Sequence, residues 1–182
     1  MRMCPSTKVL NRPPVARQHG GAFVAWGPFT ATDGSTNTWW DHLATGSYGF
    51  NDWCANPPSG EDSFWGLEST NAVRKISASG ADCIPIVLDS VYVESAPFEN
   101  NSAPTDEEHG TDVYNASYSS DAMKFHCIDR HKGGINATFV DMSARHVGLK
   151  QLWRLKWHKN FDYTNALPPN AWPTWMEKYK DY

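Results

Sequence analysis

The stretch KFHCIDRHKGGINATFVDMSARHVGLKQLWRLK, residues 124–156, decides the fold. Its first part, residues 125–130, sets Phe, Cys and Asp against His, Ile and Arg in strict alternation, which is the period-2 pattern of a β-strand. Gly133 and Gly134 then interrupt the pattern. Paired glycines between two strand-like runs indicate a tight turn, because glycine adopts positive φ at low cost. The stretch therefore predicts a strand that ends in a glycine turn.

Two more strands are expected in the same stretch. A run that contains Ala137 and Phe139 predicts a strand over residues 135–141, and the Asp and Ser of residues 141–144 form the next turn because their side chains bond nearby backbone groups. Residues 145–149 can then return as a third short strand. The three strands would form an antiparallel meander.

The rest of the chain adds strands and short helices around this meander. Residues 47–53 alternate aromatic and polar side chains, and residues 83–88 are an apolar run typical of a central strand. Helical spacing of apolar residues predicts short helices over 69–77 and 149–156, and a turn or helix in the tail at 172–179. The 13 glycines and 12 prolines favour many turns and long loops. The expected class is therefore α+β, an antiparallel sheet with long loops and short helices.

Length and charge limit the organisation and the partners of the chain. Its 182 residues are most simply one domain, residues 1–182, long enough to bury a substantial core. A net charge of −4 gives no indication that the chain binds nucleic acid or an anionic membrane. The sequence has no run of eighteen apolar residues, so it predicts no membrane span.

Four residues near predicted strand ends form a candidate active or metal site: Asp89, Asp129, His131 and Asp141. Carboxylates and a His could bind a divalent metal or exchange protons. However, the chain carries none of the common zinc-protease, nucleophile-elbow, phosphate-loop or dinucleotide-binding motifs. The favoured interpretation is structural: Asp129, Arg130 and His131 would hold the hairpin by charge-assisted hydrogen bonds, and Asp141 would cap its turn.

The cysteines and tryptophans leave alternatives open. Four cysteines allow three disulfide pairings or free buried thiols, and no two lie at zinc-ligand spacing. Exposed Trp rings could stack on sugars, which would make the chain a glycan-binding module, whereas buried Trp would fill the core of a loop-rich domain. The disulfide candidates are Cys4, Cys54, Cys83 and Cys127. The tryptophans considered for glycan binding are Trp39, Trp40, Trp53, Trp65, Trp172 and Trp175.

The central stretch resembles a known family. His131 is followed by nine residues and then Asp141, a pattern similar to the C-terminal processing-associated domain of type II secretion or type IV pilin-like proteins (pseudopilins), which is named for a His, nine arbitrary residues and Asp-Gly. The residues that carry the motif are His131, Gly133, Gly134, Asn136, Phe139 and Asp141. Met142 stands where the family has glycine, and a position that needs positive φ would strain a Met there. Further similarity covers residues 4–6, 46–51, 87–90, 148–158 and 172–176.

The resemblance implies a function. It implies a non-enzymatic structural subunit whose globular head forms the surface of a filament or pseudopilus, at the cell surface or in the periplasm, with other pilin-like subunits as partners. Such proteins begin with a basic leader and a long hydrophobic helix, which a prepilin peptidase cleaves and methylates. Residues 1–182 carry neither, so the expectation is that they are a piece of a longer protein or a late-started reading frame, attached to the membrane only through that helix.

The same resemblance implies a metal. Major pseudopilins hold Ca²⁺ in a C-terminal loop that stabilises the head, so Ca²⁺ is the candidate cofactor here. Asp89, Asp129 and Asp141 are its candidate ligands, because Ca²⁺ takes several oxygen ligands. A chelator would then lower the melting temperature.

Overall fold

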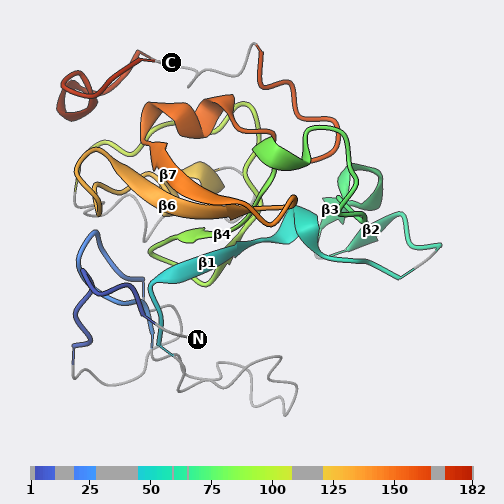
Figure 1. Ribbon diagram of the computed structural model, residues 1–182, viewed down its shortest axis with the longest axis horizontal. Helices are drawn as coiled ribbons and strands as arrows, with labels where there is room; N and C mark the ends of the chain where they lie inside the picture. The colour runs from blue at the N-terminus through green and yellow to red at the C-terminus, as the bar shows by residue number, and fades with distance from the viewer. Residues whose placement is uncertain are drawn as a thin grey trace.

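A five-stranded sheet is the centre of the fold. The computed structural model describes residues 3–10, 19–27, 45–58, 60–64, 66–107, 121–164 and 171–181. The sheet has the strand order β5-β1-β4-β6-β7 (Figure 1). Its strands are β1 (Tyr48–Asn51), β4 (Pro85–Asp89), β5 (Glu94–Ser95), β6 (Gly134–Phe139) and β7 (Ala144–Gly148).

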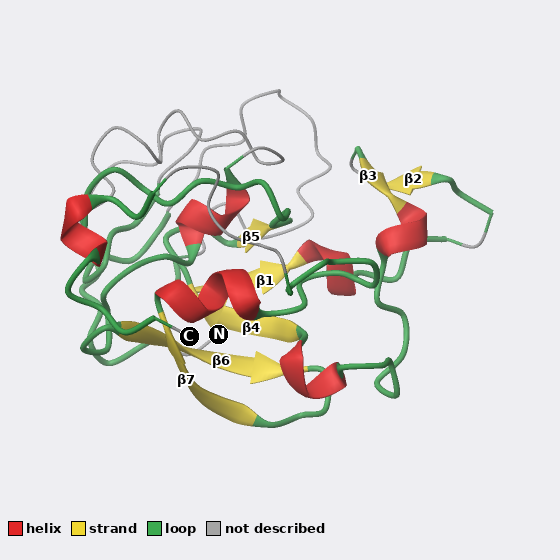
Figure 2. Cartoon of the chain, turned by 90° about the horizontal axis from the view of Figure 1, so that it is seen from above, coloured by secondary structure: helices red, strands yellow, loops and turns green. Residues whose placement is uncertain are grey.

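The sheet is mixed, which corrects the expected antiparallel sheet. β1 pairs with β4, β4 with β6, and β6 with β7 in antiparallel fashion, but β5 runs parallel to β1. The register of β4 against β6 shifts between Pro85 and Val87, where Pro85 has no N–H to donate. A separate hairpin of β2 (Ser63–Phe64) and β3 (Leu67–Glu68) lies at one end of the molecule, away from the large sheet (Figures 1 and 2).

The β6–β7 hairpin confirms the second and third strands of the predicted meander. Ile135 faces Val147 in the register, and the chain turns after Phe139, whose N–H donates to Ser143 O over 2.9 Å. The side chains of β6 alternate between a buried and an exposed face, and Ile135 and Phe139 are fully buried. This alternation anchors the hairpin to the core through one face.

The first predicted strand, residues 125–130, is wrong. The chain forms the 3-10 helix η4 (Ala122–Phe125) and then two tight local turns, in which Ile128 N–H donates to His126 O and Arg130 N–H donates to Ile128 O, both over 2.9 Å. Phe125, Cys127 and Ile128 are all buried, as is His126. Only Asp129 within residues 125–130 is partly exposed, so the alternation of residue types there does not correspond to one buried and one exposed face.

Every helix in the described ranges is a short 3-10 helix. The longest is η5 (Lys150–Arg154), in place of the helix predicted over 149–156, and the helix predicted over 69–77 reduces to η2 (Ser69–Asn71). The others are η1 (Asp52–Cys54), η3 (Ala81–Cys83) and η6 (Thr174–Met176). None of the described helices has the length and hydrophobicity to cross a membrane. The architecture is thus α+β-like, with a dominant sheet and short helices.

The main core lies between the sheet and η5, which covers one face of the sheet (Figures 1 and 2). Three tryptophans, Trp53, Trp153 and Trp157, are fully buried and pack with Ile135 and Phe139. Large aromatic side chains such as these supply much of the buried apolar surface of the core.

Candidate functional site

The buried guanidinium of Arg130 is the centre of the candidate site. Arg130 lies in the loop before β6 and is 3% exposed. Its side chain donates to the Asp89 carboxylate and to four backbone carbonyls, those of Gly21, Ala22, Ser47 and Ser90. Arginine has five N–H donors in a planar fork, so these five acceptors satisfy it completely. The side chain ties the N-terminal segment, the start of β1 and the end of β4 to one loop.

Asp89 supplies the counter-charge. Its Oδ1 accepts from Arg130 Nη1 over 3.0 Å, and its Oδ2 accepts from the Asn136 backbone N–H over 2.8 Å and lies 3.1 Å from His131 Nε2. The Asp89 side chain is 0% exposed. Charge-assisted hydrogen bonds are stronger than neutral ones, and a buried carboxylate requires such partners. We call Asp89, Arg130 and His131 the clamp.

Cys4 joins the clamp through His131. The Cys4 thiol lies 3.3 Å from His131 Nε2, and the Cys4 backbone N–H donates to Ser47 Oγ over 2.7 Å. Both the thiol and Asp89 meet the same ring nitrogen of His131. In a Cys-His-Asp catalytic relay the thiol and the carboxylate meet opposite ring nitrogens. The geometry therefore does not form a nucleophile relay.

Cys4, Asp89 and His131 also present metal-binding atoms. Their donor atoms lie within 4.8 Å of one another, and the described part of the chain holds no second group of three such donors. A thiolate, an imidazole and a carboxylate suit Zn²⁺. However, both Asp89 oxygens already accept hydrogen bonds, and the Arg130 cation lies 3.0 Å away, where it would repel a metal ion. This donor set is better suited to its internal hydrogen bonds than to a cation.

The three candidate calcium ligands do not converge on one site. Asp129 lies before β6, where its Oδ1 accepts from Gly133 N–H and its Oδ2 from the Tyr179 hydroxyl, each over 2.6 Å. Asp141 lies beyond the opposite end of β6, where its Oδ1 accepts from the Ser143 N–H and hydroxyl. Those Ser143 bonds hold the pKa of Asp141 below its ordinary value. Asp129 and Asp141 stabilise two different turns, as the structural interpretation expected.

The glycine positions of the motif have steric reasons. Gly133 has φ 92°, and a Cβ at Gly134 would overlap the Val147 carbonyl and the His146 ring. Met142, directly after Asp141, has φ 68° and is 79% exposed, so this position adopts the left-handed conformation. The Met side chain makes this turn strained.

Two other motif residues contribute to packing. The fully buried Phe139 ring lies 3.6 Å beneath the Arg145 guanidinium carbon. The Asn136 side chain is exposed, and it is the Asn136 backbone that reaches Asp89. The motif residues therefore act through backbone geometry and packing around one hairpin.

Two buried titratable groups were missed by sequence reasoning. His126 Nδ1 lies 3.1 Å from Asp89 O, and its Nε2 lies 2.5 Å from Ser95 Oγ. Burial lowers the pKa of His126 to about 4, so the ring is neutral at pH 7. Burial, with Glu94 nearby, raises the pKa of Asp52 to about 9. Ser95 and His126 are fully buried, which withholds them from any substrate.

All four cysteines are free thiols. Cys4 contacts His131, Cys54 donates to Pro85 O over 3.5 Å, and Cys127 lies 3.8 Å from the Met176 sulfur. Burial raises the pKa of Cys127 and of Cys54. The disulfide candidates therefore form no bridge in this structure, which corresponds to the free-thiol alternative.

The described tryptophans of the glycan-binding hypothesis take part in packing. Trp53 is fully buried and its indole N–H donates to Pro97 O over 2.9 Å. Trp172 packs edge-on against Trp153, and the Trp175 indole N–H donates to Pro104 O. The remaining candidates lie outside the described residues: Trp39, Trp40 and Trp65. No stacking platform is formed by the described members of the set.

Comparison with known proteins gives no match to any family model, curated protein or solved structure.

Proposed function

We propose that this chain is the globular head of a pilin-like subunit, and that its work is assembly rather than catalysis. In this proposal the head lies in the periplasm or at the cell surface, and its partners are further pilin-like subunits of a filament or pseudopilus. The proposal rests on the resemblance of the sequence motif and on what the motif residues do in the fold.

The observation that carries the proposal is the conformation of Met142. The family pattern places glycine directly after the motif Asp, and Met142 follows Asp141 with φ 68°, a conformation that glycine adopts without strain. A chance match of sequence letters would not require a left-handed residue at this position. The left-handed residue at the position where the family pattern has glycine is what supports the resemblance.

The role of His131 is further support. The motif His contacts Asp89 and Cys4 from the loop before β6, and Asp141 stabilises the turn at the other end of that strand. Residues at both ends of the motif thus stabilise the structure around β6. Such a role agrees with a subunit whose head must remain rigid while it is packed among copies of itself.

Chemical cross-linking in intact cells tests the assembly. The protein is produced from its own gene and treated with an amine-reactive reagent, and an antibody raised against residues 1–182 detects the products. We expect a ladder at multiples of the subunit mass in cells, while the isolated 20.4 kDa chain at matched concentration stays monomeric. A single monomer band in the treated cells would contradict the proposal.

A further inference from the structure

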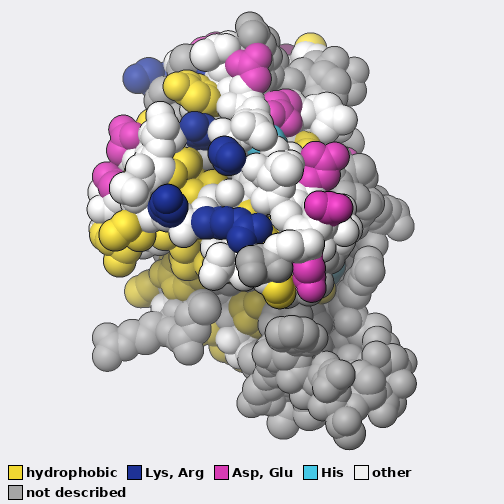
Figure 3. Space-filling model, turned by 90° about the vertical axis from the view of Figure 1, so that its right-hand side faces the viewer, with side chains coloured by type: hydrophobic (Ala, Val, Ile, Leu, Met, Phe, Trp, Pro, Cys, Tyr) yellow, Lys and Arg dark blue, Asp and Glu magenta, His cyan; other side chains and the backbone are white. Residues whose placement is uncertain are grey.

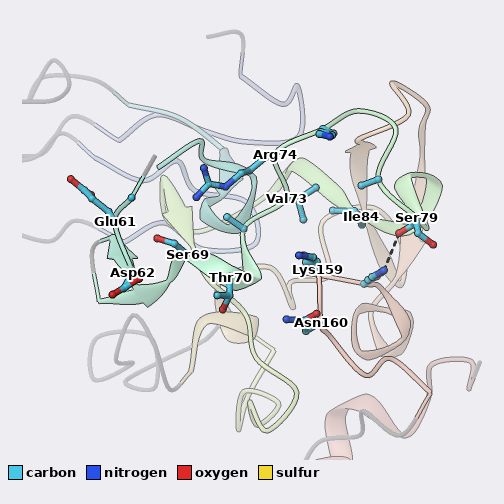
Figure 4. Close-up of a pocket in the computed structure, with 15 residues that line it drawn as sticks. Glu61, Asp62, Ser69, Thr70, Val73, Arg74, Ser79, Ile84, Lys159 and Asn160 are labelled. Atoms are coloured by element: carbon cyan, nitrogen blue, oxygen red, sulfur yellow. Dashed lines mark hydrogen bonds between the residues drawn. The ribbon is translucent and has the colours of Figure 1, made fainter. Parts of the chain in front are cut away.

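A cavity of about 800 Å³ opens beside η2. It is bordered by residues 60–62, by residues 69–79 and by residues 156–160 (Figure 4). Figure 4 shows Glu61 and Asp62 at one end, Ser79 at the other, and Arg74, Val73 and Lys159 between them. Its volume lies in the range of pockets that hold small molecules, roughly 300–1,000 Å³. We call it the basic pocket.

Four cationic side chains line the basic pocket: Arg74, Lys75, Lys156 and Lys159. Arg74 donates to Pro57 O over 3.1 Å, and Lys156 donates to Ser79 O over 2.9 Å, so both are held by uncharged carbonyls. Among the residues that the structure describes, none of the four forms an ion pair with a carboxylate. Glu61 and Asp62 also line the pocket, so its four cations exceed its carboxylates by two, a local excess of positive charge in a chain whose net charge is −4.

Figure 3 shows one side of the molecule, coloured by the type of side chain. Lys and Arg side chains gather around a recess in which hydrophobic atoms are visible, while acidic side chains lie mainly to one side. The hydrophobic lining of the basic pocket comes from Ala72, Val73, Ala78 and Ile84, and Val73 and Ile84 belong to a small separate core cluster. The basic pocket therefore has an apolar base and a charged rim.

A buried hydroxyl points to a missing partner. Ser69 lines the pocket and is 7% exposed, yet its Oγ makes no hydrogen bond. Buried hydroxyls nearly always have a partner, and leaving one unpaired costs about 1–3 kcal/mol. Thr70 and Asn160 add further polar groups to the same lining, which together can bind the hydroxyl groups of a ligand.

We propose that the basic pocket binds an anionic group, a carboxylate, sulfate or phosphate, carried by a small hydroxylated molecule such as an acidic sugar. Lys75 and Lys159 hold the anion, while Ser69 and its polar neighbours bond the hydroxyl groups. The carbon skeleton packs on the apolar base near Val73 and Ile84. Binding here does not require that the chain assemble into a filament.

Isothermal titration calorimetry on the 182-residue chain tests the proposal. The probes are glucuronate, inorganic sulfate and inorganic phosphate, with glucose as the neutral counterpart of glucuronate. The pocket variant carries Lys75→Gln and Lys159→Gln. The matched control carries Lys8→Gln and Lys132→Gln, which remove the same charge from exposed residues that do not line the pocket. Circular dichroism checks that both variants fold.

We expect saturable binding of at least one anion, weakened about tenfold or more in the pocket variant and unchanged in the control. Glucuronate as the tightest probe would support an acidic sugar, and a tighter inorganic anion would support a sulfate or phosphate ester. Equal losses of anion affinity in the pocket variant and the control would overturn the proposal, since they would show nonspecific electrostatic attraction rather than binding in the pocket. So would glucose binding as tightly as glucuronate, or no saturable binding of any anion.

Discussion

Replacing Asp89 with Asn would leave a buried guanidinium without its counter-charge. The Asp89 and Arg130 side chains are each 0% exposed and meet over 3.0 Å, so water cannot take the place of the lost charge. Removing one partner of a buried pair costs about 3–5 kcal/mol. The amide of Asn adds a second conflict, because its NH₂ group would face either Arg130 or the Asn136 N–H, both of which are donors.

The expected loss for Asp89→Asn is therefore about 3–5 kcal/mol of unfolding free energy, a large part of the roughly 5–15 kcal/mol that a domain has. Urea unfolding followed by the fluorescence of the buried Trp53, Trp153 and Trp157 measures it. Agreement of the fluorescence and circular dichroism midpoints establishes that unfolding is two-state.

Two further variants make this result specific. Arg130→Lys keeps the positive charge but cannot supply five donors, so it too should lower the stability clearly. Glu68→Gln removes an exposed carboxylate and should change the stability by no more than about 0.5 kcal/mol. A loss below about 1 kcal/mol for Asp89→Asn would refute the reasoning, because the pair would then contribute no more than an exposed ion pair.

Three further predictions follow from single residues. Met142→Gly should raise the free energy of unfolding by about 0.5–1 kcal/mol, because φ 68° strains every residue but glycine, while Met142→Ala should bring no such gain; a destabilised Gly variant in urea titrations would count against this. Because the pKa of Asp52 is raised to about 9, its ionisation favours the unfolded chain between about pH 4 and pH 9. Asp52→Asn should therefore stabilise the protein at pH 7 by at least about 1 kcal/mol and have little effect at pH 4, and a gain that grows towards low pH would contradict the sign. A calcium chelator should leave the melting temperature unchanged, since Asp129 and Asp141 stabilise separate turns, and a clear drop would reveal a calcium site.

The β6–β7 hairpin could be predicted from sequence because its signals are local. Gly133 and Gly134 mark its start, and Asp141 and Ser143 form its turn through bonds within two residues of each other. Such contacts depend on the immediate chain and little on the remainder of the fold. They were sufficient to locate both strands to within two residues at each end.

Tertiary contacts explain where the prediction failed. A helix was expected over 149–156, and Leu152 and Trp153 of this segment are buried in η5. However, the Lys156 N–H donates to Cys83 O over 3.0 Å, which directs the chain out of the helix after Arg154. In residues 125–130 every side chain but that of Asp129 is buried, so the alternation there does not mark one exposed and one buried face. Hydrophobic periodicity identifies an element that has one exposed and one buried face, and it gives no information about an element that is buried on both faces.

The clamp could be predicted only in part. Sequence reasoning grouped Asp89 with His131, and Arg130 with His131, but it did not pair Arg130 with Asp89, which lies 41 positions away. Cys4 is still more distant, 127 positions from His131. The available signal was a charged residue at the end of an apolar strand, since such a residue needs a partner once it is buried.

The measurement that tests the central claim most directly is the coding sequence upstream of the Met1 codon, read in frame. A head domain of a pilin-like subunit predicts a basic leader followed by about twenty apolar residues, enough to span a bilayer as a helix. An in-frame stop codon together with a ribosome-binding site immediately before Met1 would contradict the claim, because the head would then have no helix through which to enter a filament.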